Sequence, residues 1–125
     1  MPEENVPDEN GRKGNEREIY VLVLREIVVA QDIGMIIRDL RPDARIVVAA
    51  NLAEAAESIP EGKVAAAFVE AAAHVFATSP LWPRVQADGG KSVLVNEAVA
   101  GQGHSILSFP FDNDDVAALL AANGL

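Results

Sequence analysis

Short, continuous apolar segments recur along this chain, and they constrain its fold more than any other feature. The first, IYVLVL (Ile19–Leu24), contains no charged or amide residue that would favour a solvent-facing side. This composition is typical of a strand buried on both faces of a parallel sheet. Similar segments follow at intervals, and we predict five strands: Ile19–Leu24, Arg45–Ala50, Val64–Val69, Ser92–Val95 and Ser105–Phe109.

Segments with helical spacing of apolar residues alternate with these strands. Asn51 is a favourable cap for the second of them, because Glu54 follows three residues later, as in a capping box. Asn113 is the expected cap of the last. We predict helices over Glu26–Leu40, Leu52–Ile59 and Asn113–Leu125, and a loop and helix over Ala71–Ala87 that Pro80 and Pro83 interrupt.

The alternation of strands and helices predicts an α/β fold with a parallel sheet. Five strands suit the flavodoxin-like order 2-1-3-4-5, a three-layer sandwich with helices on both faces. Ligands of such sheets bind at the carboxyl ends of the strands. The candidate site residues are therefore those that follow or end the strands: Arg25, Glu26, Glu70, Asn96 and Phe109.

Length and charge limit the remaining possibilities. The 125 residues suffice for one domain, and the net charge of −9 argues against a nucleic-acid surface. Residues 1–18 hold six acids and three bases with almost no apolar residues, so we expect a disordered acidic tail before a domain over 19–125. With no cysteine and no run long enough to span a membrane, we expect a cytoplasmic protein without membrane contacts.

Other site chemistries find little support in the residues. Glu70 and His74 stand four positions apart, as in a metal pair, but no third ligand is evident and we expect no metal and no cofactor. No glycine-rich loop follows the first strand, which argues against a dinucleotide or P-loop site. No serine stands in a G-x-S-x-G turn, so an acyl-transfer triad has no basis.

Three stretches carry a resemblance to a known family: RDLRPDARIVVAANLAEAAESI, EGKVAAAFVEA and ILSFPFDNDDVAALLA. Over Ile19 to about Ala122, the chain resembles the receiver domain of two-component response regulators. The resemblance implies an acid pair after the first strand that helps to hold Mg²⁺, and a phosphate-accepting aspartate after the third. It further implies a hydroxyl residue after the fourth strand and a Lys-Pro step after the fifth.

This chain departs from that pattern at most of the functional positions. Glu70 stands at the acceptor position and Asn96 at the hydroxyl position. Phe109 replaces the lysine, although Pro110 is kept. The acid pair falls around Arg25 and Glu26, where at most one acid survives.

These losses weaken phosphate chemistry. Mg²⁺ prefers several oxygen ligands, and here Arg25 would compete with it as a fixed cation. The extra methylene of Glu70 shifts the nucleophile, and errors of that size cost on the order of a hundredfold in rate. Two roles remain open for Glu70: a salt bridge to Arg25 that locks one conformation, or an imitation of the phosphorylated state.

Two further regions raise possibilities of binding. Trp82 lies between prolines in SPLWPRV, where it either fills the core or serves as an exposed anchor for a partner. The connection Asn96–His104 leaves room for only a shortened fourth helix, which would remake the family's usual signalling face.

The resemblance implies a degenerate receiver, or pseudo-receiver, that acts in phosphorelay signal transduction. We expect it to act by protein–protein interaction, with a signalling protein or a second copy as partner, without aspartyl phosphorylation and not as an enzyme. Two alternatives remain. One is a weakly phosphorylated receiver, and the other is a small α/β enzyme or ligand-binding domain that uses Glu26, Glu70 and Asn96.

Overall fold

The computed structural model describes residues 18–60, 62–96, 104–108 and 111–121. They form one five-stranded parallel sheet with the predicted order, β2-β1-β3-β4-β5. The strands are β1 (Glu18–Val23), β2 (Arg45–Ala49), β3 (Lys63–Val69), β4 (Lys91–Val95) and β5 (Ser105–Leu107). The described helices are α1 (Ile27–Leu40), α2 (Leu52–Ser58), α3 (Ala73–Ala77), α4 (Leu81–Ala87) and α5 (Asn113–Ala121).

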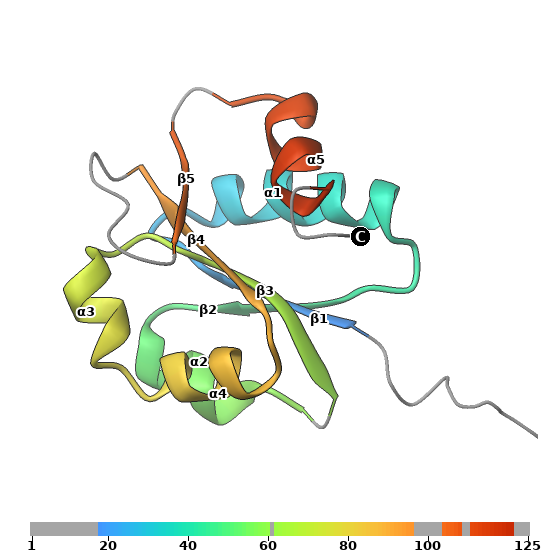
Figure 1. The fold of residues 1–125 in the computed structure, drawn as a ribbon. Helices are drawn as coiled ribbons and strands as arrows, with labels where there is room; N and C mark the ends of the chain where they lie inside the picture. The colour runs from blue at the N-terminus through green and yellow to red at the C-terminus, as the bar shows by residue number, and fades with distance from the viewer. Residues whose placement is uncertain (1–17, 61, 97–103, 109–110, 122–125) are drawn as a thin grey trace, which may run out of the picture.

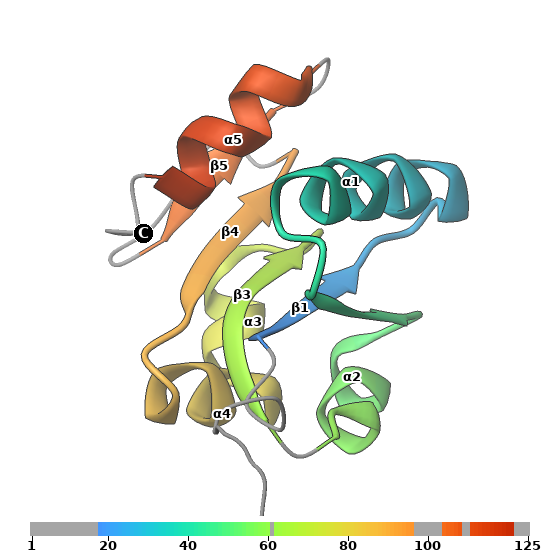
Figure 2. The same cartoon turned by 90° about the vertical axis from the view of Figure 1, so that its right-hand side faces the viewer.

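The helices form two layers around the sheet, as Figures 1 and 2 show. Helices α1 and α5 lie side by side on one face, and α2, α3 and α4 cover the other. β1 supplies both cores by alternation. Tyr20 and Leu22 pack toward α1, whereas Ile19 and Val21 pack toward the opposite layer, and all four are fully buried. The prediction of a strand buried on both faces is therefore confirmed.

Asn51 caps α2 as predicted. Its side chain accepts a hydrogen bond from the Glu54 backbone N–H at 2.8 Å, and Glu54 Oε1 accepts one from the Ala50 N–H at 3.0 Å. One free amide of the first helical turn, that of Glu54, and the amide of Ala50 just before the cap are thereby satisfied.

The predicted cap of α5 was wrong by one residue. Asp112 is the cap, because its Oδ1 accepts a hydrogen bond from the Asp115 N–H at 3.0 Å. Asp115 Oδ2 accepts one from the Asp112 N–H at the same distance, which completes a capping box. Asn113 is instead the first helical residue.

The predicted interruption of the segment Ala71–Ala87 is confirmed at Pro80, which lies between α3 and α4, but is wrong for Pro83. Pro80 precedes α4 at its cap position, but Pro83 lies within the first turn of that helix and does not interrupt it. An amide in the first turn has no partner inside the helix, so proline is tolerated there. β1 begins at Glu18, one residue inside the predicted tail.

The end of α4 is tied to the start of β3. Asp88 Oδ2 accepts hydrogen bonds from the Val64 backbone N–H at 2.9 Å and from Arg84 Nε at 3.0 Å. The Val64 bond is the main reason that the pKa of Asp88 lies below its usual range. The backbones are so close here that a Cβ added to Gly90 would lie 2.4 Å from the Val64 carbonyl oxygen.

No helix in the described part of the chain is long and apolar enough to cross a membrane.

Candidate functional site at the carboxyl ends of the strands

The parallel sheet brings the predicted site residues to one edge. Arg25 and Glu26 follow β1, Glu70 directly follows β3, and Asn96 directly follows β4. β1, β3 and β4 are neighbours in the sheet, so these residues share its carboxyl edge. Phe109 and Pro110 lie outside the described residues, as does most of the connection predicted to hold a shortened fourth helix.

Glu70 is joined to the segment after β1 by two hydrogen bonds. Its backbone N–H donates to the Val23 carbonyl at 2.8 Å, which extends the ladder between β1 and β3. Its Oε1 accepts from the backbone N–H of Arg25 at 2.9 Å. The carboxylate thus supplies the next acceptor after the strand pairing ends, and it fixes the start of the loop that leads into α1.

This contact corrects the expected salt bridge between Arg25 and Glu70. The two residues do meet, but the recorded bond comes from the Arg25 amide and not from its guanidinium, which is exposed. A backbone N–H is present whatever the side chain is. The carboxylate of Glu70 therefore holds the loop whatever side chain stands at residue 25, and the Arg25 guanidinium is free for other contacts.

Glu26 and Asn96 stand apart from this contact. Glu26 caps α1 in extended conformation, and neither side chain makes a hydrogen bond within the described part of the chain. Asn96 has a left-handed backbone, with φ of 61°, which asparagine tolerates better than most residues. Its N–H donates to the Leu107 carbonyl at 2.7 Å, so Asn96 ends β4 and ties it to β5.

The described residues offer few ligands for a metal ion. His74 lies exposed on α3, and no cluster of three or more His, Asp or Glu side chains that could hold a metal is present among the described residues. Of the two predicted site carboxylates, Glu26 and Glu70, only that of Glu70 accepts a hydrogen bond within the described part of the chain. The arrangement offers little to an octahedral cation, which prefers several positioned oxygens.

Trp82 belongs to an aromatic cluster beneath β4. Its ring meets Phe76 edge-on at 5.2 Å and lies 5.0 Å from the ring of His104. Phe76 is fully buried, whereas Trp82 and His104 are half-buried. His104 Nδ1 is 2.7 Å from Ser92 Oγ, and burial lowers the pKa of His104 below its usual value. The structure thus places Trp82 mainly as a core-filling side chain of the α4 layer.

One feature escaped the sequence reasoning altogether. A hollow opens between α1 and β2, lined mainly by apolar side chains and by Arg38. Gly34 inside a helix and Met35 outside its buried stripe were its only signals in the sequence.

Comparisons with known proteins support the fold and go no further. No model of a known family matches the chain, and no curated protein matches it either. Among solved structures, the chain is similar to the solution structure of SdrG from Sphingomonas melonis Fr1, with a TM-score of 0.66 and 19% sequence identity. The similarity covers 89% of this chain and 98% of that one. At this identity the comparison shows a shared fold: the chain is a flavodoxin-like α/β protein.

Proposed function

We propose that this chain is a degenerate receiver domain that acts by binding other proteins and takes no phosphoryl group. The observation that carries the proposal is the hydrogen bond between Glu70 and Arg25. At the position where the resemblance implies a phosphate acceptor, a glutamate oxygen is already engaged by a backbone amide at 2.9 Å. A side chain that holds its own loop has a structural task that phosphorylation would disrupt.

The environment of Glu70 supports the same conclusion. An acyl phosphate needs Mg²⁺ and a cation to neutralise its oxygens. Here the acid between β1 and α1, Glu26, is exposed, and its side chain makes no hydrogen bond among the described residues. The lysine position holds Phe109. The phosphate chemistry implied by the resemblance therefore lacks both the fixed Mg²⁺ ligands and the cation, and we assign the domain no catalytic activity of its own. As in the sequence analysis, we expect a cytoplasmic location.

A binding role is supported by the face that β5 and α5 form. A hollow of about 440 Å³ lies there, lined by residues that include Ile106, Leu107, Asp115 and Leu119. β5 is only three residues long and stands at the edge of the sheet. Such a depression, with apolar and polar side chains in its lining, lies beside a short edge strand and suits the docking of a partner protein.

Treatment with acetyl phosphate tests the proposal. The protein is incubated with acetyl phosphate and Mg²⁺, and its intact mass is then measured under conditions that preserve acyl phosphates. We expect no gain of a phosphoryl group in wild type. A gain that disappears in Glu70→Gln, but persists in a control at the exposed Glu57 of α2, Glu57→Gln, would instead establish a weakly phosphorylated receiver.

A further inference from the structure

β2 is an edge strand without the usual protection. It lies first in the sheet order and pairs only with β1 among the described strands. Its sequence, RIVVA, carries a single charge at Arg45, and Val48 near its other end is 44% exposed. Natural sheets normally block such edges with charges, prolines or bulges, because free backbone groups recruit another strand.

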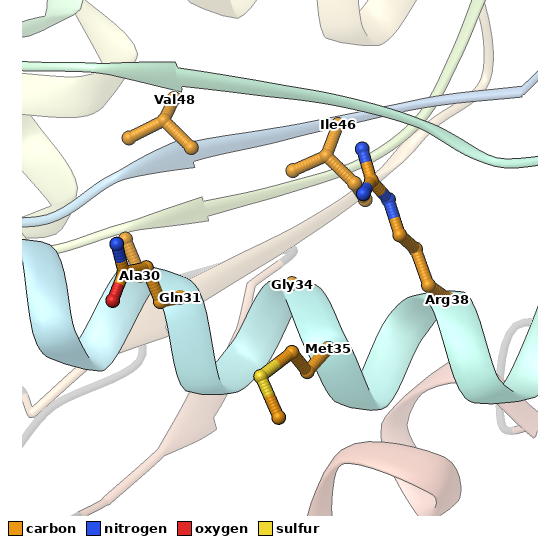
Figure 3. A pocket seen from close by; sticks show the side chains of 7 residues that line it. All are labelled: Ala30, Gln31, Gly34, Met35, Arg38, Ile46 and Val48. Atoms are coloured by element: carbon orange, nitrogen blue, oxygen red, sulfur yellow. The ribbon is translucent and has the colours of Figure 1, made fainter.

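The hollow between α1 and β2 lies beside this edge, and Figure 3 shows the side chains around it. Its volume is about 330 Å³. Ala30 and Gly34 contribute the α1 side, and Ile46 and Val48 contribute the β2 side. Gly34 leaves room on the α1 side, because a Cβ there would make only an ordinary contact with Ile46 at 3.6 Å.

One of the residues that line the hollow, Met35, also projects from α1. Met35 is 65% exposed, and Ile27 and Val28 on the same helix are 60% and 62% exposed. In Figure 3 the Met35 side chain lies on the outer side of α1, away from Ile46 and Val48. The surface therefore carries a projection and a depression one residue apart, which is the pattern of a face that can complement itself.

We infer that the β2 edge and α1 form a two-fold interface with a second copy of this chain. The two β2 strands pair antiparallel around Val47, the middle residue of the strand, and the sheet continues across the axis. The two α1 helices then run antiparallel on the same face. Each Met35 faces the other copy's hollow, and the apolar surface of α1 becomes covered.

One pair of opposite charges on α1 fits this arrangement, whereas Asp32, exposed near the middle of the helix, comes close to its own copy across the axis and opposes it. Glu26 and Arg38 lie at opposite ends of α1, and neither makes an ion pair in the described part of the chain. Twelve residues of helix separate them by roughly 18 Å, too far to pair within one chain. Antiparallel helices bring Arg38 of one copy toward the end that carries the partner's Glu26. The net charge of −9 opposes association at long range, but salt at 0.15 M screens charges beyond about 8 Å.

A foreign extended segment could pair with β2 as well, but it would leave Met35 uncovered. A second copy uses both of these features at once. The inference deepens the proposed function by naming one partner, and its test does not depend on phosphorylation.

Sedimentation equilibrium of the full-length chain at physiological salt tests the interface. We expect a concentration-dependent dimer in wild type. Met35→Lys should weaken dimerisation by about tenfold or more, because it places a charge in the partner's apolar hollow. Val75→Lys is the matched control, because Val75 is 45% exposed and lies on α3, at the opposite face of the sheet. The Val75→Lys protein should dimerise like wild type. Circular dichroism checks that both variants fold.

Charge reversal provides a second and more specific test. Arg38→Glu should weaken the dimer, and Arg38→Glu combined with Glu26→Arg should restore it. The restoration can arise only between chains, because the two positions are too far apart within one helix. A monomeric wild type at all concentrations, equal weakening by Met35→Lys and Val75→Lys, or failure of the double variant to restore would each overturn the inference.

Other occupants of the face would give a different result. If the wild type is monomeric and deletion of residues 1–17 shifts the amide signals of Gly34 and Val48, the tail covers the hollow and the inferred dimer is wrong.

Discussion

The carboxylate of Glu70 accepts a hydrogen bond from the backbone N–H of Arg25 at 2.9 Å, across the carboxyl ends of β3 and β1. This single contact assigns a structural role to both residues. Glu70 becomes an anchor for the loop into α1, and Arg25 contributes its amide and not its charge. The position that the receiver resemblance implies for phosphate chemistry is occupied by a structural bond.

The contact makes different predictions for its two residues. Glu70→Ala should lower the free energy of unfolding by about 1 kcal/mol, because it removes a partly buried acceptor of a charge-assisted bond. Arg25→Ala keeps the amide and should change stability by about 0.5 kcal/mol or less. Urea unfolding of both variants measures the difference. If Arg25→Ala is the more damaging change, the guanidinium has a role that the structure does not assign to it.

The capping box of α5 predicts a contrast between neighbouring residues. Asp112→Ala should cost about 1 kcal/mol, because the Asp115 amide loses its acceptor. Asn113→Ala removes no capping bond and should cost less than about 0.5 kcal/mol. Thermal or urea unfolding distinguishes the two. Equal effects would argue against Asp112 as the cap.

Two glycines should respond to alanine in opposite directions. Gly90→Ala would force a Cβ against the Val64 carbonyl oxygen, where the unrelaxed separation is 2.4 Å, so we expect a loss of about 2 kcal/mol or more. Gly34→Ala meets only ordinary contacts at 3.6 and 3.7 Å and should stabilise α1 by about 0.5–1 kcal/mol. Chemical unfolding of both proteins provides the check, and a stable Gly90→Ala variant would contradict the close approach of the two backbones.

His104 predicts a pH dependence of stability. Burial lowers the pKa of His104 in the folded state below its ordinary value of 6.5. Below pH 6.5 the unfolded chain therefore binds the proton more readily, so stability should fall as the pH drops from 6.5 toward the folded-state pKa. His104→Phe keeps an aromatic ring beside Trp82 and should remove this part of the pH dependence. Unfolding measured from pH 7.5 to 5.5 tests this, and identical slopes in the two proteins would contradict it.

Much of the fold could be predicted from the sequence because the strands coincide with short, continuous apolar runs. A run such as Ile19–Leu24 has no polar face, and only a central strand can bury it on both sides. The strand order came from the receiver resemblance together with the α/β alternation. The cap of α2 was found because Asn51 and Glu54 stand three residues apart.

The failures have equally specific causes. Asp112 and Asn113 are both good caps, and only the partner at Asp115 decides between them. Topology correctly placed Arg25 beside Glu70, but a backbone amide leaves no mark in a sequence, so the expected bond was assigned to the wrong atoms. The hollow beside β2 depends on the distance between a helix and an edge strand, which residue patterns do not encode.

The central claim is that the carboxyl edge around Glu70 binds no phosphoryl group, and beryllofluoride, a mimic of the acyl phosphate, tests it most directly. Amide spectra of the protein are recorded by NMR during titration with beryllofluoride in the presence of Mg²⁺. We predict that the signals of Arg25, Glu70 and Asn96 stay in place throughout. Saturable shifts concentrated at these residues, and absent in Glu70→Gln, would contradict the central claim and show that the edge around Glu70 binds a phosphoryl group.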